Sequence, residues 1–237
     1  MKAVILAGGK GTRLAPYTKI LPKPLMPIGD MPILEVLLRQ LKAAGVKDVV
    51  ITVGHLASLL RTYFMDGREF GVNISYSQED QPLGTAGPLS LIPDLSDTFF
   101  VMNGDVLTTL KFQELLQFHK SQKAIATIAA HQRTVKIELG VLQHADGDYR
   151  VTNYIEKPTY DYLVSMGIYI FEPEVLEFIP KNEYLDFPNL VLKLIAADKK
   201  VCYLPYEGYW KDLGHPEDYE QAGQDFHNLR SEFLQEN

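Results

Sequence analysis

Leu6-Ala-Gly-Gly-Lys-Gly-Thr-Arg-Leu14 joins a continuous apolar run, residues 3–7, to a loop with three glycines and two cations. Such a run is typical of a β-strand that is covered on both faces of a parallel sheet. The glycines leave backbone N–H groups unobstructed, so a phosphate or a base can approach the main chain, and Arg13 offers a guanidinium to phosphate oxygens. A plain turn is the alternative at this point. The pattern indicates an α/β sheet with a ligand site after its first strand.

Neither of two common phosphate-binding patterns fits this loop. A Walker loop is absent because no Gly-Lys-Ser/Thr stands at the required spacing. The dinucleotide fingerprint is absent because Thr12-Arg13-Leu14 follows where a third glycine would be needed.

The chain on either side of the loop predicts the architecture. The first half alternates expected helices and strands, which favours a doubly wound, mainly parallel Rossmann-like sheet. The expected helices are residues 33–44 and 55–65, and the expected strands are 48–53, 72–77 and 98–102. After about residue 120 we expect strands at 124–130, 140–143, 149–155, 165–171 and 200–204, and helices at 174–179, 187–197 and from 216. We interpret this second half as a mixed-sheet extension that completes a cleft over the first half.

Composition excludes several classes of protein. The 237 residues carry a formal charge of −7 with a pI near 5.4, which argues against a general nucleic-acid binder. The single cysteine, Cys202, rules out an internal disulfide and a cysteine metal cluster. No apolar stretch approaches the length of a membrane span, and the apolar start is too short for a secretory signal. We therefore expect a cytoplasmic protein with neither nucleic acid nor membrane as a partner.

Three charged residues stand beside prolines or at strand ends, which restrict where their side chains can point. Lys23 stands between prolines in Pro22-Lys-Pro-Leu-Met-Pro27, so it could meet Arg13 across a polyphosphate. Asp105 ends a buried strand, where open α/β sheets bind ligands and where a carboxylate is a natural magnesium ligand. Asp212 follows a short strand and could face the same metal. A solvated lysine and helix-capping aspartates are the alternatives. The six histidines form no metal pattern, and nothing supports covalent catalysis.

Seven ordered motifs together resemble the sugar-1-phosphate nucleotidyltransferase family, nearest the mannose-1-phosphate guanylyltransferase type and the heptose-phosphate guanylyltransferases. The resemblance runs from residue 1 to about 222. The motifs are Leu6-Ala-Gly-Gly-Lys-Gly-Thr-Arg-Leu14, Pro22-Lys-Pro-Leu-Met-Pro27, Leu83-Gly-Thr-Ala-Gly87, Asn103-Gly-Asp105, Glu156-Lys-Pro158, Gly167-Ile-Tyr169 and Trp210-Lys-Asp-Leu-Gly214.

The resemblance implies one domain, residues 1–237, with a nucleotide-binding half of about 1–120 and a sugar-phosphate-binding half of about 121–225. It implies Mg²⁺ as cofactor, held by Asp105 and Asp212, and catalytic roles for Arg13 and Lys23. The implied nucleotide-binding residues are Leu6, Ala7, Gly8, Gly9, Gly11, Thr12 and Gly84, and Glu79 joins them on the argument below. The implied sugar-phosphate-binding residues are Gly140, Glu156, Lys157 and Gly167.

Some positions depart from the family pattern. Leu139 precedes Gly140 where many members carry an aromatic residue, and Ser165-Met166 precedes Gly167 where many have a small residue or asparagine. Both departures concern the sugar. We also expect the protein to lack the C-terminal hexapeptide β-helix that many relatives carry, and a homodimer is left open.

Glu79 favours GTP as the nucleotide. It stands five residues before Gly84, where uridylyl- and thymidylyltransferase relatives can place a glutamine. Guanine presents two adjacent donors, which a carboxylate accepts and an amide cannot. A shift of one residue would instead place Gln78 or Asp80 at the base.

The implied reaction joins a nucleoside triphosphate and a sugar 1-phosphate to give a nucleotide sugar and pyrophosphate. A uridylyl- or thymidylyltransferase of the same fold is the alternative, along with a catalytically silent regulatory paralogue and a nucleotide-sugar-dependent glycosyltransferase. Intact Lys23, Asp105 and Asp212 argue against the silent paralogue, and the Gly-Thr-Arg loop argues against the glycosyltransferase.

Overall fold

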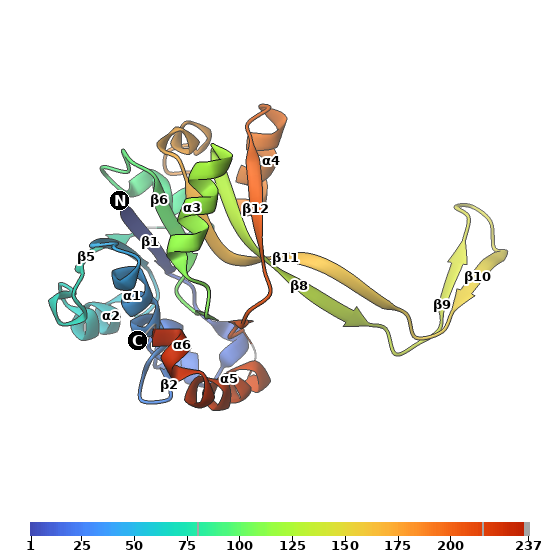
Figure 1. Cartoon of the computed structure of the whole chain (residues 1–237), viewed down its shortest axis with the longest axis horizontal. Helices are drawn as coiled ribbons and strands as arrows, with labels where there is room; N and C mark the ends of the chain where they lie inside the picture. The colour runs from blue at the N-terminus through green and yellow to red at the C-terminus, as the bar shows by residue number, and fades with distance from the viewer. Residues whose placement is uncertain (80, 215, 235–237) are drawn as a thin grey trace.

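The computed structural model describes residues 1–79, 81–214 and 216–234. Its core is a seven-stranded sheet in the order β12-β8-β11-β6-β1-β4-β5. Parallel pairs join β1 to β4 and β6, β4 to β5, and β12 to β8, whereas β11 runs antiparallel to β6 and β8. The fold prediction of a mainly parallel α/β sheet is therefore confirmed (Figure 1). The strands are β1 (Lys2–Ala7), β4 (Asp48–Val53), β5 (Asn73–Gln78), β6 (Phe99–Asn103), β8 (Ala126–Lys136), β11 (Thr159–Phe171) and β12 (Val201–Tyr206).

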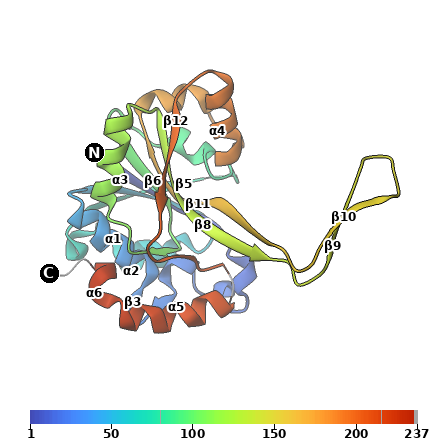
Figure 2. The same ribbon diagram turned by 45° about the vertical axis from the view of Figure 1, so that its right-hand side comes forward.

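Apolar cores cover both faces of this sheet. In β1, Ala3 and Ile5 belong to the core on one face and Val4 to the core on the other, as alternation along a strand requires. The first face packs against α1 (Ile33–Ala43), α2 (Ala57–Phe64) and α3 (Phe112–Gln122). The second packs against α4 (Phe187–Ala196), which Figure 2 labels, and against the 3-10 helices η5 (Gly87–Leu91) and η6 (Pro173–Phe178).

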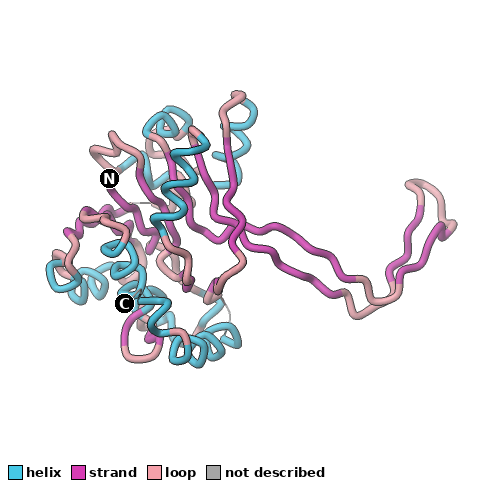
Figure 3. The backbone as a smooth tube through the Cα atoms, viewed as in Figure 1, coloured by secondary structure: helices cyan, strands magenta, loops and turns pink. Residues whose placement is uncertain are grey.

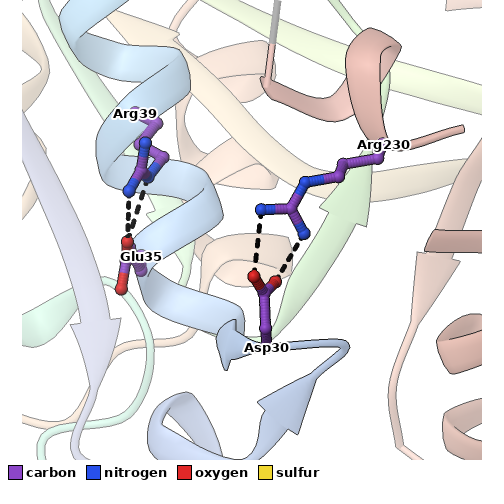
Figure 4. Close-up of polar contacts among 4 residues, drawn as sticks. All are labelled: Asp30, Glu35, Arg39 and Arg230. Atoms are coloured by element: carbon purple, nitrogen blue, oxygen red, sulfur yellow. Dashed lines mark hydrogen bonds and ion pairs between the residues drawn. The ribbon is translucent and has the colours of Figure 1, made fainter. Parts of the chain in front are cut away.

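A third core joins the C-terminal helices to the first half of the chain. α5 (Pro216–Asn228) and α6 (Arg230–Leu234) pack on the short strands β2 (Pro27–Ile28), β3 (Met31–Pro32), β7 (Val106–Thr108) and β13 (Trp210–Asp212). Gln40 in α1 donates to the carbonyl of Phe233 over 2.9 Å. Arg230 forms an ion pair with Asp30, next to the Glu35–Arg39 pair on α1 (Figure 4). The C-terminal segment thus holds β13 against the first half of the chain.

The second half contains an arm, residues 132–165, that leaves the body of the molecule (Figure 3). β8 and β11 continue past the sheet as a two-stranded ribbon, in which residues 132–136 pair with 159–163. The tip of the arm, residues 137–158, carries β9 (Val141–His144) and β10 (Val151–Ile155) as a separate antiparallel pair. We expected these strands to complete a cleft over the first half. The structure differs, because a ribbon this long carries its tip away from the sheet (Figure 1).

Other local differences follow from weak sequence signals. Helix α3 was missed, although the expected strands on each side left room for it. The expected helix at 174–179 is a 3-10 helix, which begins at Pro173. Strand β11 begins at Thr159 rather than residue 165. No helix in the described ranges has the length and apolar character needed to cross a membrane. The remaining 3-10 helices are η1 (Thr12–Leu14), η2 (Tyr17–Lys19), η3 (Lys23–Leu25) and η4 (Arg68–Phe70).

Candidate functional site

A cavity of about 760 Å³ opens where β1, β4 and β6 end. This is the carboxyl edge of the parallel strands, where open α/β sheets bind ligands. Every residue predicted to bind the nucleotide lines this cavity: Leu6, Ala7, Gly8, Gly9, Gly11, Thr12, Glu79 and Gly84. Arg13, Lys23 and Asp105 line it as well.

The glycine loop is held by close backbone approaches. Gly11 has φ +60°, and a Cβ there would lie 2.9 Å from the Cγ2 of Thr18. The Thr18 hydroxyl donates to the Gly11 carbonyl over 2.8 Å. A Cβ on Gly54, which follows β4, would lie 2.8 Å from the Gly8 carbonyl oxygen. Side chains at Gly11 and Gly54 would therefore displace the loop.

Glu79 points into the cavity from the end of β5. A Cβ on Gly8 would come within 2.9 Å of the Glu79 Oε1 atom, so the carboxylate lies against the glycine loop. The Leu83 N–H donates to Glu79 Oε2 over 2.8 Å, which fixes the side chain. Gln78 does not line the cavity; its Oε1 accepts from Arg61 at 3.4 Å. Asp80, the other alternative, lies outside the described residues.

Residues 184–186 form a wall of the cavity that the sequence did not predict. Asp186 Oδ1 accepts from the backbone N–H of Thr85 at 3.0 Å and from its hydroxyl at 3.2 Å. The Tyr184 hydroxyl donates to Asp186 Oδ2 over 2.6 Å and holds the pKa of that carboxyl below its usual range. Gly84 has φ +79°, and a Cβ there would lie 2.7 Å from the Leu185 carbonyl oxygen. Asp186 is the N-cap residue of α4, and its position in the sequence is typical of a helix cap. Its side chain makes no cap hydrogen bond and binds Thr85 instead.

Lys23 is a buried cation between two carboxylates. Its ammonium contacts Asp105 directly and lies 3.6 Å from Asp212 Oδ1. The two acids meet because β7 and β13 pair antiparallel with Asp212 opposite Val106, the residue after Asp105. The strand register thus brings together residues that are far apart in the sequence.

Arg13 lies against the same segment. A Cβ on Gly214 would come within 3.1 Å of Arg13 Nη1, so the guanidinium packs on the main chain two residues after Asp212. Lys10, Arg13 and Lys23 all line the cavity. Three carboxylates, Glu79, Asp105 and Asp186, line it as well, so the cavity is balanced in charge although the whole chain carries −7.

Asp105 and Asp212 form a donor set that fits Mg²⁺. Mg²⁺ binds hard oxygens and commonly takes one or two carboxylates, with water and substrate phosphates filling its other positions. The second oxygen of each carboxylate makes no bond with the described part of the chain. No group of three or more His, Cys, Asp or Glu side chains that could hold a metal occurs within that part. A metal with an all-protein ligand shell is therefore not supported there.

The structure separates the predicted sugar-phosphate residues into two places. Gly167 has φ +73° at a bulge in β11, and a Cβ there would lie 2.5 Å from Asn103 Nδ2, so it borders the cavity through Asn103. Gly140, Glu156 and Lys157 belong to the tip of the arm and do not line the cavity. The Tyr154 side chain, which is 60% exposed, lies over Gly140.

Comparisons with known proteins fit this arrangement. A mannose-1-phosphate guanyltransferase from Yarrowia lipolytica is 40% identical over 231 residues, which cover 92% of this chain and 62% of that enzyme. A UTP–glucose-1-phosphate uridylyltransferase from Synechocystis is 38% identical, over 94% of this chain and 62% of that enzyme. The chain thus spans under two thirds of the length of both relatives.

Solved structures agree with the fold. HddC from Yersinia pseudotuberculosis superposes with a TM-score of 0.71 at 26% identity, over 95% of this chain and 99% of that one. A second structure of HddC, complexed with GMP-PN, has a TM-score of 0.71 at 25% identity and covers 95% of this chain and 99% of that one. The family model described as nucleotidyl transferase matches residues 2–228. This chain therefore belongs to the nucleotidyl transferase family.

Proposed function

We propose that this protein transfers GMP from GTP to a sugar 1-phosphate, giving a nucleotide sugar and pyrophosphate. The observation that carries the proposal is the arrangement at the cavity: a glycine loop and the buried Lys23 line it together with Asp105, and Asp212, which does not line it, lies 3.6 Å from the Lys23 ammonium. Such a site suits two phosphate-bearing substrates with a divalent cation. The family to which the chain belongs and the GMP-PN bound by the HddC neighbour support the same reaction.

The transfer needs no protein nucleophile. An oxygen of the sugar phosphate attacks the α-phosphorus of GTP, a new P–O bond forms, and the bond to the β-phosphate oxygen breaks. Pyrophosphate carries away the electron pair of that bond. Because two polyanions must meet, positioning and charge neutralisation supply most of the rate.

The residues of the cavity divide these tasks. Lys23 contacts Asp105 and lies 3.6 Å from Asp212, so it would face the α-phosphate, while Arg13 and the glycine loop would hold the leaving pyrophosphate. Asp105 and Asp212 would hold Mg²⁺. Bound Mg²⁺ supplies neutralisation of phosphate charge. Lys157 would hold the attacking phosphate, while Gly140, Glu156 and Gly167 would border the sugar.

Glu79 supports guanine as the base. Its carboxylate is turned into the cavity and pinned by the Leu83 N–H, yet each oxygen keeps a lone pair for another donor. Guanine N1–H and its 2-amino group match these acceptors. Sequence identity alone does not distinguish guanine from uracil as the base, because the guanylyl and uridylyl relatives are 40% and 38% identical to this chain.

A matrix of GTP, UTP, dTTP, ATP and CTP against several sugar 1-phosphates tests the proposal. Pyrophosphate release with Mg²⁺ should be highest for GTP and should require a sugar phosphate. Faster turnover with UTP or dTTP would refute the guanylyl assignment and keep nucleotidyl transfer. No release with any pair would favour a catalytically silent paralogue.

A further inference from the structure

The arm exposes apolar side chains along its whole length. Among residues 132–165, all of which the structure describes, none is buried. Tyr149 is fully exposed, and Leu139 is 73% exposed. The other large apolar residues of the arm that are exposed are Val135, Leu142, Val151, Tyr154, Tyr162 and Leu163. A two-stranded ribbon is only marginally stable in water, so this arm needs a surface to pack against.

One face of the ribbon is the more apolar of the two, and its outer part is exposed at Val135 and Tyr162. Cross-strand partners share a face, which places Val135 with Tyr160, Arg133 with Tyr162, and His131 with Val164 on one side. At the base of the ribbon this face is covered, because the ring of Trp210 lies 5.5 Å from the ring of His131.

The opposite face is more polar. It carries Thr134 bonded to Asp161, Lys136 opposite Thr159, and Gln132 opposite Leu163, the one apolar residue among these pairs. The ribbon is therefore amphipathic, and the covering that its apolar face receives at His131 does not continue outward.

The charged residues proposed to bind the sugar phosphate are on the tip of the arm and do not line the cavity of the same chain. The cavity is lined by the groups for a nucleoside triphosphate, but Glu156 and Lys157, which the proposed function assigns to the sugar phosphate, are on the tip. Both views show the arm pointing away from the body, with β9 and β10 at its far end (Figures 1 and 2). The site is thus incomplete within one chain.

We propose that two copies of this chain exchange arms. The apolar face of each ribbon packs on the other copy, and the tip brings Glu156 and Lys157 to the other copy's cavity. This inference rests on the proposed function, since it takes the role of Lys157 from there. A twofold arrangement satisfies both arms and both cavities at once, because each copy gives and receives the same element.

Mixing two defective variants tests the exchange. One variant has an impaired arm, Glu156→Ala with Lys157→Ala; the other has an impaired cavity, Asp105→Asn. In a mixed dimer, the Asp105→Asn copy lends an intact arm to the intact cavity of its partner. Random pairing makes half of the dimers mixed, each with one whole site, so co-expression should restore about a quarter of the wild-type turnover. A mixture no more active than the mean of its parents would overturn the proposal.

The parents' activities separate this proposal from the proposed function. Wild-type protein that is active while both parents are nearly silent validates the mixing test. An arm variant as active as wild type would overturn arm exchange and leave nucleotidyl transfer standing. A chain with residues 138–157 replaced by a tight turn serves as a second arm variant, and its thermal unfolding shows whether the body is intact.

The oligomeric state gives a readout independent of activity. Sedimentation of the wild-type chain should show a dimer. Tyr162→Glu, on the apolar face and opposite Arg133, should shift the chain to monomers and lower its turnover. The matched variant Thr134→Lys, on the polar face and opposite Asp161, should remain a dimer. A wild-type monomer at assay concentration, or a Tyr162→Glu dimer with full activity, would overturn the proposal.

Discussion

Single side chains decide the chemistry of the cavity, and close backbone contacts hold them in place. Glu79 lies against Gly8 and accepts from the Leu83 N–H, so it presents its carboxylate in one direction. Lys23 is buried beside Asp105, with Asp212 next to it. Because contacts within the chain hold both arrangements, changes of one functional group should alter specificity or rate without altering the fold.

Glu79→Gln should weaken the use of GTP relative to UTP and dTTP. The amide offers one acceptor and one donor, so it can no longer accept both guanine donors. A bidentate base contact discriminates by about 1–3 kcal/mol, so the ratio of kcat/KM values should shift by roughly tenfold or more. Gln78→Glu, one residue away but outside the cavity, is the control and should leave the ranking unchanged. If Glu79→Gln keeps the wild-type ranking, another residue selects the base.

Asp105→Asn should lower kcat by about 10²–10³-fold, the range typical of losing one group that stabilises charge in a transition state. The amide has the shape of the carboxylate but binds Mg²⁺ poorly, so the unfolding midpoint should change little. Asp97→Asn makes the same change at an exposed position and should have wild-type kinetics. Near-normal turnover of Asp105→Asn at limiting Mg²⁺ would remove Asp105 from the mechanism.

Two loops shape one wall of the cavity, although their sequences contain few patterns that predict a contact between them. The loop after β5 is joined to the segment before α4 through Thr85 and Asp186, and through the N–H groups of Ala86 and Gly87, which donate to the Leu185 carbonyl. Gly84 lies at the closest approach of the two segments. This junction forms the wall of the cavity beside Glu79.

Gly84→Ala should destabilise the protein more than Gly45→Ala. Both glycines have φ near +80°, so both alanines incur the left-handed backbone cost of roughly 1–2 kcal/mol. Only at Gly84 would the new Cβ also meet backbone, 2.7 Å from the Leu185 oxygen, whereas nothing lies within 4 Å at Gly45. Urea unfolding of both variants gives the comparison. Equal losses of unfolding free energy would mean that the segments around Gly84 and Leu185 move apart at little cost.

Local sequence patterns predicted most of the helices and strands. They predicted few of the contacts between residues that are far apart in the sequence. The apolar runs at β1, β4 and β6 and the periodic apolar face of α1 are strong local signals, and all four elements occur as expected. Strand order then brings the predicted nucleotide residues to one edge. The position of the arm depends on what its apolar face packs against, which no local pattern contains. Tyr184 and Asp186 were missed because they reach the cavity through a contact with Thr85, about 100 residues away in the sequence.

At the scale of the whole molecule, the C-terminal helices pack on elements from the first half of the chain. α5 and α6 pack on β2, β3 and β13, and the Tyr219 hydroxyl donates to the Pro27 carbonyl. Lys211 in β13 forms an ion pair of 3.4 Å with Asp225 in α5. Since β13 also carries Asp212, the C-terminal helices support the acidic pair from outside the cavity.

Phe226→Ala should reduce the free energy of unfolding by about 3–5 kcal/mol, the usual loss for a buried phenylalanine. The ring is 1% exposed, stacks on Phe233 at 5.4 Å, and lies so close to Gly29 that a Cβ there would be 2.8 Å away. Asp30→Ala, which breaks the exposed pair with Arg230 on the same side of the fold, should change stability far less. Urea unfolding distinguishes the two. Similar losses would show that charge rather than packing holds the C-terminal helices.

The bond that breaks in GTP tests the central claim most directly. Two samples of GTP, one labelled at the α-phosphate and one at the γ-phosphate, are incubated with the wild-type chain, Mg²⁺ and the best sugar 1-phosphate from the matrix. Cleavage between the α- and β-phosphates should move the α-label into the nucleotide sugar and release the γ-label as pyrophosphate. Release of the γ-label as inorganic phosphate, or an α-label that never joins the sugar, would contradict nucleotidyl transfer.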